Sequence, residues 1–370
     1  MEGEKELLQK QKRFIRNFAI QSAMLLILAG VAVIVFDPFF HYHKPVGSLK
    51  AVVTKAEYQC IGTVRNFDYD SILLGSSVAE NYNNRWFDEA FGTTTIKGIK
   101  SSAATVDLIW YLKEAFEAKK DTGLKEVYYS MDLFALSADA EKVFPDDSLP
   151  LYLYNDNPAD DVNYIWNKDV ICEHIPYLLA MTYLDDYDEG TSYNWAQYKV
   201  FSKEETLSHY SRPEKAVPML TEEDYKRNID KNISLIEEVV KAHPETTFRF
   251  IYPPYSMLWW DAAYRNGETE QNLYAAGQAA ERLLAYENAE LYYFQNDEEL
   301  ITDLDHYMDT VHFSDEINHV IVERMKEGKY KLTKDNYKQE LEKMKKLSEK
   351  IEREYIKEYF EDGRMQKGKK

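Results

Sequence analysis

The stretch DSILLGSSVAEN (residues 70–81) is a short apolar run that stops at Gly-Ser-Ser and continues into a polar segment. A strand that delivers a small hydroxyl group onto a glycine turn is one way in which hydrolase folds present a nucleophilic serine. Gly and Ser are also the usual turn residues, so the same letters are compatible with an ordinary strand-to-helix loop. The rest of the chain has to decide between these interpretations.

Strand-like and helix-like patterns alternate along the chain. The predicted strands are residues 71–74, 126–136, 247–255 and 289–294, and the predicted helices are residues 106–117, 222–242, 271–286 and 315–326. This alternation predicts an α/β fold with a central parallel sheet covered on both faces. Ligands in such folds bind at the carboxyl ends of the strands.

The N-terminal region predicts a membrane anchor. Residues 18–36 (FAIQSAMLLILAGVAVIVF) carry no charge, and at about 1.5 Å per residue they reach the thickness of a hydrocarbon core. Lys and Arg are concentrated before this run, which places residues 1–16 in the cytoplasm, the anchor at 17–36 and the remainder outside the cell membrane. A cleaved signal peptide is the alternative, but the run is long for one and no small-residue cleavage site follows.

The remainder divides into a large domain and a tail. Residues 37–330 form the predicted extracytoplasmic domain, with an insertion at about 137–220 that is rich in Tyr, Trp, Asp and Pro and weak in periodicity. Residues 331–370 are rich in Lys and Glu, with apolar residues three or four apart, which predicts an amphipathic helical tail. Such a tail docks either on the body of the protein or on a partner.

Composition excludes several classes of function. The formal net charge of −19 over 370 residues argues against nucleic-acid binding, which needs clustered Lys and Arg. Two cysteines, Cys60 and Cys172, are too few for a disulfide scaffold, and whether they pair is open. The sequence contains no Gly-rich phosphate loop, dinucleotide fingerprint or metal-ligand spacing, so we predict neither a cofactor nor a metal.

A serine nucleophile requires a base and a group that orients the base. The stretch HYMDTVHFSDEIN (residues 306–318) places Asp309 three residues before His312, just ahead of the last predicted helix of the sheet domain. Three residues is about one helical turn, so both side chains can face the same way. Ser77 is then the candidate nucleophile, His312 the base and Asp309 the orienting carboxylate. The structural alternatives are a plain turn for Ser77 and a histidine at a helix start for His312.

Gly75-Ser76-Ser77 after the first strand, with Asp309-x-x-His312 before the last helix, resembles the SGNH (GDSL-like) hydrolase superfamily. The resemblance runs from about residue 15 to residue 340 and is closest to membrane-anchored members of Gram-positive bacteria, which are similar to the D-alanine transfer protein of teichoic acid synthesis. It implies a flavodoxin-like three-layer fold and Ser-His acyl transfer. It also implies work beside a multi-pass membrane-bound O-acyltransferase.

The sequence departs from the family at the groups that stabilise the oxyanion. Relatives use the backbone N–H of the serine, a Gly of a second loop and an Asn side chain of a third. Here the second position falls near Ser102, with Gly98 as a competitor, and the third position holds Asp132. An ionised Asp cannot donate a hydrogen bond, so Asp132 would have to be protonated or to bind a loop or a substrate hydroxyl instead.

We further expect Asp132, Asn81 and Tyr255 to lie on the substrate rim, where aromatic faces stack on sugars. The hypothesis is an extracytoplasmic esterase or O-acyltransferase that acts on a cell-envelope polymer, a teichoic acid or an exopolysaccharide, through a Ser-His-Asp triad and an acyl-enzyme. The first alternative is a catalytically degenerate envelope protein that binds a glycan or a membrane-bound acyltransferase. The second is a metal-dependent envelope hydrolase that uses the histidines.

Overall fold

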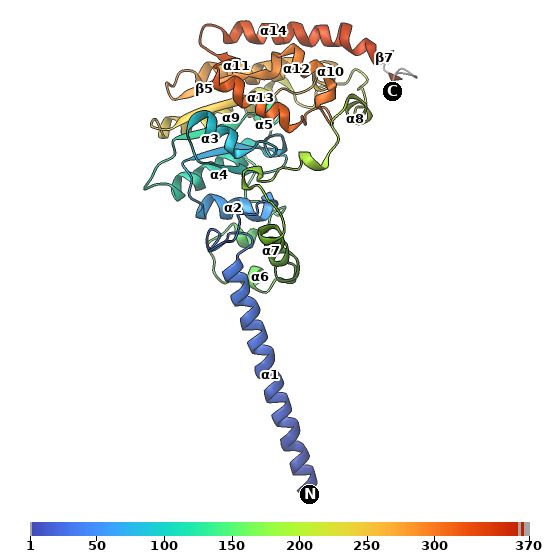
Figure 1. Ribbon diagram of the computed structural model, residues 1–370. Coiled ribbons are helices and arrows are strands. Elements are labelled where there is room, and N and C mark those ends of the chain that lie inside the picture. Colours follow the sequence, from blue (N-terminus) through green and yellow to red (C-terminus); the bar gives the residue numbers. More distant parts are fainter. Residues whose placement is uncertain (1, 362–363, 366–370) are drawn as a thin grey trace.

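The computed structural model describes residues 2–361 and 364–365, and a six-stranded sheet forms its centre (Figure 1). The strands are β1 (Ser71–Gly75), β2 (Thr95–Ile99), β3 (Glu126–Ser130), β4 (Thr247–Tyr252), β5 (Ala289–Tyr293) and β6 (Lys331–Leu332). Their order is β2-β1-β3-β4-β5-β6; the first five are parallel, and β6 is antiparallel to β5. The order 2-1-3-4-5 is that of the flavodoxin-like doubly wound fold, so the predicted fold class is confirmed.

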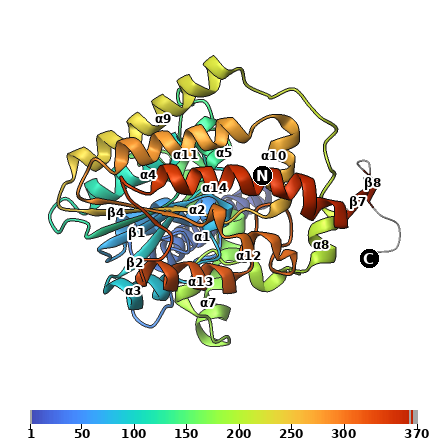
Figure 2. The same cartoon turned by 90° about the horizontal axis from the view of Figure 1, so that it is seen from above.

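Helices cover both faces of the sheet. Figure 2 shows α9 (Glu222–Ala242) and α11 (Thr269–Leu283) on one side, and α3 (Asn84–Phe91) and α13 (Asp315–Lys326) on the other. This cover explains β1, because a strand that is buried on both faces reads as a continuous apolar run. Its residues Ile72, Leu73 and Leu74 are completely buried.

Further helices extend these layers. Helix α4 packs against β1, β2 and α9, α2 lies beside α4 and β2, and α14 packs on α11. The bounds of these and neighbouring helices are α2 (Ala56–Asn66), α4 (Thr105–Ala118), α10 (Met257–Asn266), α12 (Glu298–Thr302), α14 (Tyr337–Lys350) and the single turns η6 (Phe294–Asn296) and η7 (Leu304–His306).

Two predicted strands are shorter in the structure, for local chemical reasons. The strand predicted at 126–136 ends at Ser130, and α5 (Leu133–Ser137) takes up the apolar residues that follow. The strand predicted at 247–255 ends at Tyr252 because Pro253 and Pro254 have no N–H to donate to a neighbouring strand.

Helix α1 (Glu2–Phe36) stands out from the body in Figure 1. Among the described residues it is the helix long and apolar enough to cross a membrane. It is continuous through the predicted boundary at residues 16 and 17, so the charged N-terminal segment extends the same helix. Near its end it packs on α6 (Val162–Ile165): a Cβ at Gly30 would lie 3.0 Å from Cγ2 of Ile165, and the indole N–H of Trp166 donates to the carbonyl of Leu26 at 3.0 Å.

The predicted insertion is built from short helices joined by loops. Figure 1 shows α6 and α7 at the end of the body from which α1 leaves. The elements between α5 and α9 are η2 (Leu151–Leu153), α6, η3 (Val170–His174), α7 (Ile175–Tyr183), η4 (Glu189–Thr191), η5 (Ala196–Tyr198) and α8 (Lys203–Ser208). Their shortness accounts for the weak periodicity of this stretch.

The C-terminal segment packs on the body. Strand β6 completes the sheet, and α14 buries Met344 and Leu347. Leu341 reaches α11, where its Cδ1 lies 3.3 Å from the position that a Cβ at Gly277 would take. The chain continues through η8 (Ile351–Tyr355), η9 (Ile356–Glu358) and the strands β7 (Phe360–Glu361) and β8 (Arg364–Met365).

Candidate active site

The Gly-Ser-Ser stretch ends β1 and turns at once into the single helical turn η1 (Ser77–Ala79). A Cβ at Gly75 would lie 2.4 Å from Cβ of Ala79 and 2.9 Å from Cβ of Ser130. Only glycine therefore lets the turn fold back so closely over the end of the strand. The turn leaves the Ser77 side chain half-buried at the carboxyl edge of the sheet, whereas Ser76 is buried.

Asp309 and His312 lie in a hydrogen-bonded loop before α13. The sequence suggested that one helical turn would align them, but the loop is instead closed by a bridge between Tyr307 and Phe313. One carboxylate oxygen of Asp309 accepts the backbone N–H groups of Val311 at 2.9 Å and His312 at 2.8 Å. Its other oxygen accepts from Nδ1 of the His312 ring at 2.6 Å. Asp309 thus stabilises the loop with one oxygen and orients the His312 ring with the other.

Ser77 Oγ lies 2.8 Å from Nε2 of His312. Because the Asp309 carboxylate can only accept, Nδ1 of His312 carries the proton, and Nε2 of the neutral ring is free to accept from the serine. The side chains of His312 and Asp309 are 21% and 26% exposed, so a small molecule can approach the pair. This arrangement has the contacts of a serine nucleophile, a base and an orienting acid.

The environment keeps Asp309 in its charged form. Burial by itself would raise the pKa of Asp309, but the hydrogen bond and charge of His312, together with the two backbone N–H groups, outweigh it and lower the pKa below its ordinary value. The carboxylate therefore remains an acceptor for Nδ1 of His312 over the whole neutral range.

The segment after β4 supports this loop from beneath. The Tyr307 hydroxyl donates to the carbonyl of Pro254 at 2.9 Å, and the Ser256 hydroxyl and backbone N–H both donate to the carbonyl of Thr310, at 2.8 and 3.0 Å. Tyr255 is completely buried beside it. The segment that contains Tyr255, which the sequence analysis placed on the rim, thus supports the loop of Asp309 and His312.

All three predicted rim residues are interior, which corrects that expectation. Asp132, Asn81 and Tyr255 are 2%, 1% and 0% exposed. The Tyr255 hydroxyl donates to Asp132, and the Asn81 side-chain oxygen accepts the backbone N–H groups of Trp195 and Ala196, both at 3.1 Å. These side chains make internal hydrogen bonds, as buried polar groups generally do, although Oδ2 of Asp132 is buried without a hydrogen-bond partner among the described residues.

Asp132 lies next to the nucleophile turn. Burial raises its pKa, and the hydrogen bond from the Tyr255 hydroxyl opposes this rise. Among the described residues, the Ser77 hydroxyl is bonded to His312 and Asp132 to Tyr255, while the buried Ser76 hydroxyl has no hydrogen-bond partner.

The two candidate oxyanion positions of the second loop differ in place. Gly98 lies inside β2 opposite Leu74, and a Cβ there would meet Cδ2 of Leu74 at 2.7 Å, so this glycine serves close packing of the sheet. Ser102 is exposed in the following loop with a left-handed φ of 54°. The N–H of Lys100 donates to the carbonyl of Gly75 at 3.3 Å, which holds this loop beside the nucleophile turn. Of the two, only Ser102 lies beyond the edge of the sheet.

Three residues near the pair escaped sequence reasoning. Trp195, from the insertion, sets its ring edge-on to the His312 ring with centroids 5.3 Å apart. Burial raises the pKa of Glu80 to about 7, although the Trp195 indole and Lys97 lower it, and burial lowers the pKa of Lys97 to about 7 against the pull of Glu80. The sequence contains one feature that indicates such a buried charge, which is the lysine in the otherwise apolar strand TIKGI (residues 95–99).

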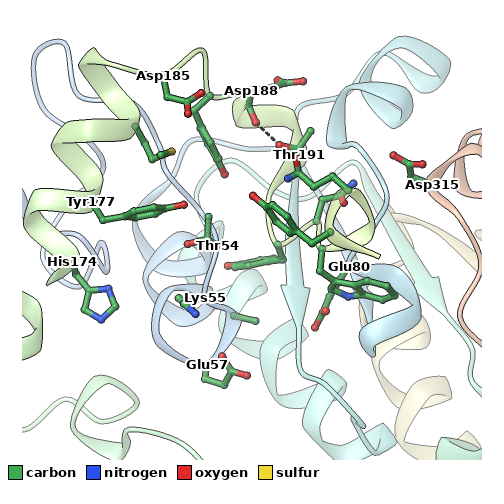
Figure 3. A pocket seen from close by; sticks show the side chains of 18 of the residues that line it. Thr54, Lys55, Glu57, Glu80, His174, Tyr177, Asp185, Asp188, Thr191 and Asp315 are labelled. Atoms are coloured by element: carbon green, nitrogen blue, oxygen red, sulfur yellow. Dashed lines mark hydrogen bonds between the residues drawn. The ribbon is translucent and has the colours of Figure 1, made fainter. Parts of the chain in front are cut away.

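A cavity of about 850 Å³ lies behind Trp195 and Glu80 and is lined by neither Ser77 nor His312. Figure 3 shows Tyr177 pointing into it from α7, with Glu80 on the opposite side and Lys55 and Glu57 between them. Glu80 follows Ser77 by three residues, and Trp195 contributes to its wall while touching the His312 ring. The link between the cavity and the pair of Ser77 and His312 is therefore indirect, through Trp195 and Glu80.

Neither a group of metal ligands nor a disulfide is present among the described residues. Over residues 2–361 and 364–365, no three His, Cys, Asp or Glu side chains are grouped as metal ligands. Cys60 is buried and Cys172 is exposed, and both are free thiols.

Comparisons with known proteins add little to this geometry. No protein-family model and no curated protein match the sequence. A solved structure from Streptococcus pneumonia, described as "a putative platelet activating factor", is similar with a TM-score of 0.38 and 10% identity, over 74% of this chain and 90% of that chain. The fold assignment therefore rests on strand order, and the chemistry rests on the residues themselves.

Proposed function

We propose that this chain is a membrane-anchored serine esterase or O-acyltransferase in which Ser77 is the nucleophile, His312 the general base and Asp309 the orienting acid. The observation that carries the proposal is the hydrogen-bonded chain from Ser77 Oγ through the His312 ring to the Asp309 carboxylate, with distances of 2.8 and 2.6 Å. A serine hydroxyl is a weak nucleophile until a base can take its proton, and this contact supplies the base.

The reaction follows from these contacts. Ser77 Oγ attacks the carbonyl carbon of an ester while its proton passes to Nε2 of His312, and the ring charge is stabilised by Asp309. The protonated ring then gives the proton to the leaving alcohol, and an acyl ester remains on Ser77. Water or an acceptor hydroxyl, deprotonated by the same nitrogen, attacks this ester and releases an acid or a new ester.

The developing oxyanion needs donors at the edge of the sheet. In this proposal the backbone N–H of Ser77 and an N–H of the loop that contains Ser102 supply them. A backbone donor requires no particular side chain, which fits a loop with Ser in place of Gly. Asp132 stays hydrogen-bonded to Tyr255 and does not act as an oxyanion donor.

The helix α1 suggests the location of this chemistry. Lys10, Lys12, Arg13 and Arg16 precede its apolar run, so we infer a cytoplasmic N-terminus and a body outside the cell membrane. Substrates in this compartment are polymers of the cell envelope, and a membrane-bound O-acyltransferase is the partner that would deliver acyl groups to Ser77. An anchored enzyme meets such substrates at a raised local concentration.

The experiment is labelling of the full-length protein in detergent with a fluorescent fluorophosphonate. The wild type should be labelled, Ser77→Ala should not, and His312→Ala should react far more slowly. Ser76→Ala is the matched control, because Ser76 is the adjacent serine but is buried and makes no contact with His312. Labelling that survives in a folded Ser77→Ala protein would overturn the assignment.

A second function is favoured by Asp132. Because this residue takes the place of a side-chain donor and is engaged with Tyr255, a catalytically degenerate protein that binds a glycan or an acyltransferase is the alternative. In that case a folded wild-type protein would resist the fluorophosphonate as completely as Ser77→Ala does.

A further inference from the structure

The cavity beside the reactive pair has the features of a sugar site. Its volume of about 850 Å³ is within the range of roughly 300–1,000 Å³ that small-molecule pockets occupy. Tyr177 is 40% exposed and Tyr198 is 77% exposed, and both line it. Exposed aromatic faces next to polar groups offer a flat apolar surface to a ring and hydrogen bonds to its hydroxyls.

Polar side chains complete the lining. Asn194 and Gln197 come from the same segment as Trp195 and Tyr198. Thr54, which precedes α2, and Thr191 of η4 also line the cavity (Figure 3). Side-chain amides and hydroxyls both donate and accept hydrogen bonds, so they can bind the hydroxyl groups of a saccharide whether these donate or accept.

The charge of the lining is strongly one-sided. Six acidic side chains besides Glu80 line the cavity, among them Glu57, Glu173 and Asp185, and Lys55 is the lysine that lines it. Asp188 is partly compensated by Arg85 at 2.8 Å, and Asp186 lies 3.9 Å from Lys50. A concave surface with excess negative charge concentrates cations and repels anions, and the effect is greatest at low ionic strength.

We propose that this cavity binds the saccharide acceptor of the reaction, and that it takes a glycan without negative charge, neutral or amine-bearing, while it excludes polyphosphate polymers. The role of the glycan as the acceptor of the acyl group rests on the proposed function. The binding of the glycan depends only on the residues that line the cavity. Among the envelope polymers that the resemblance suggested, it selects an exopolysaccharide over a teichoic acid.

The transfer step requires the bound glycan to extend past Trp195, because Ser77 and His312 are not among the residues that line the cavity. A hydroxyl of the bound sugar loses its proton to Nε2 of His312 as its oxygen attacks the acyl ester on Ser77. The bond between the acyl carbon and Ser77 Oγ breaks, and the proton passes from Nε2 to that oxygen. The products are an acylated sugar and the free Ser77 hydroxyl, so no further reactant is needed.

The insertion is what builds this cavity. Lys97 on β2 donates to the backbone carbonyls of Glu80 and Ser192, which ties the nucleophile turn to the segment that carries Trp195 and Tyr198. Asn81 binds the same segment through the N–H groups of Trp195 and Ala196. The acceptor surface is thereby held in register with Ser77.

The test is calorimetric titration of the full-length Ser77→Ala protein with three tetrasaccharides that differ in charge. These are N-acetylglucosamine tetramer, its deacetylated glucosamine form and tetragalacturonate. The neutral and cationic tetramers should bind, the cationic one more tightly at low salt, and tetragalacturonate should bind at least about tenfold more weakly. Equal or tighter binding of tetragalacturonate, or no binding of the other two at millimolar concentration, overturns the proposal.

Matched tyrosine variants locate the binding. Tyr177→Ala should weaken binding about tenfold or more, and Tyr264→Ala should leave it unchanged, because Tyr264 is 41% exposed, as Tyr177 is 40%, but lies on α10 away from this cavity. Equal effects of the two variants would contradict the assignment of the cavity.

Transfer is measured separately on the wild type. Incubation with an activated acetyl ester and the bound tetramer should yield an acetylated tetramer by mass spectrometry, and Tyr177→Ala should reduce its yield. If the tetramers bind but the fluorophosphonate does not label Ser77, then the proposed enzyme function fails while the saccharide site stands. If labelling succeeds but the tetramers do not bind, the reverse holds.

Discussion

The hydroxyl of Ser77 lies 2.8 Å from Nε2 of His312, although 235 residues of chain separate the two. The contact arises because Ser77 follows the carboxyl end of β1 and His312 precedes α13, the helix that covers the same side of the sheet as α3. Parallel strands bring their carboxyl ends to one edge, so residues from opposite ends of the chain meet there.

If Ser77 and His312 act as one unit, their substitutions will not be additive. Ser77→Ala and His312→Ala should each lower kcat for an activated ester by about 10³-fold or more, and the double variant should be no worse. Asp309→Ala should lower kcat less than either, because this residue orients the ring and stabilises its charge but does not receive the proton. Steady-state kinetics with circular dichroism to verify folding measures this, and additive effects would argue for separate roles.

Gly75 should be intolerant of a side chain. Because a Cβ there would lie 2.4 Å from Ala79 and 2.9 Å from Ser130, Gly75→Ala must displace the nucleophile turn. We expect a loss of about 1–3 kcal/mol of stability and a fall in fluorophosphonate labelling. Gly277→Ala is the control: this glycine is inside α11 and faces only the end of the Leu341 side chain, so it should be neutral or stabilising.

Lys97 should make stability depend on pH above neutrality. Burial lowers its pKa to about 7 in the folded protein, below the ordinary value of 10.5, while the unfolded chain retains its proton up to that value. Between these two pH values the unfolded state binds more protons than the folded state, so the free energy of unfolding increases with pH. The contribution of neutral Lys97 to this free energy is complete above pH 10.5 and is lost as the pH falls through about 7.

Chemical denaturation of wild type and Lys97→Met at several pH values tests this. The free energy of unfolding of the wild type should rise relative to that of Lys97→Met between pH 7 and pH 10. A constant difference would show that Lys97 does not titrate in this window. The variant also lacks the hydrogen bonds to the carbonyls of Glu80 and Ser192, so its KM for a saccharide acceptor should rise.

The Asp309 carboxylate should stabilise the fold until the pH is strongly acidic. Its pKa is lowered in the folded state, so its contribution is present above the unfolded value of 3.8 and is lost as the pH falls through the lower folded value. Asp309→Asn should therefore be less stable than wild type at neutral pH, by about 1–3 kcal/mol. This gap should close in acid, and a gap that instead widens in acid would contradict the sign.

The two cysteines provide a natural probe of orientation. Cys172 is exposed on the body and Cys60 is buried. If the body lies outside the cell, a membrane-impermeant maleimide should label the full-length protein on intact cells, and Cys172→Ser should abolish the label. Labelling that appears only after lysis would place the body in the cytoplasm.

Local patterns were sufficient for most of the architecture. The apolar run 71–74 and the helical spacing of 222–242 each depend on residues close together in sequence, so β1 and α9 appear at nearly the predicted bounds. The uncharged run 18–36 is helical as predicted, but its helix begins earlier, at Glu2. The errors were also local in origin: the prediction carried β3 beyond Ser130 and β4 beyond Tyr252, where a new helix and two prolines end the strands.

The site divides in the same way. The sequence by itself determined which groups are candidates for reaction, because Gly75-Ser76-Ser77 and Asp309-x-x-His312 contain the proposed nucleophile, base and orienting acid. Only the tertiary structure decided that Asp132, Asn81 and Tyr255 are buried, that Trp195 contacts the His312 ring, and that Trp195, Glu80 and Tyr177 line one cavity. The reason is physical: whether a polar or aromatic side chain is buried depends on which distant segment packs over it, and the irregular insertion carries no periodic signal that would reveal its partner.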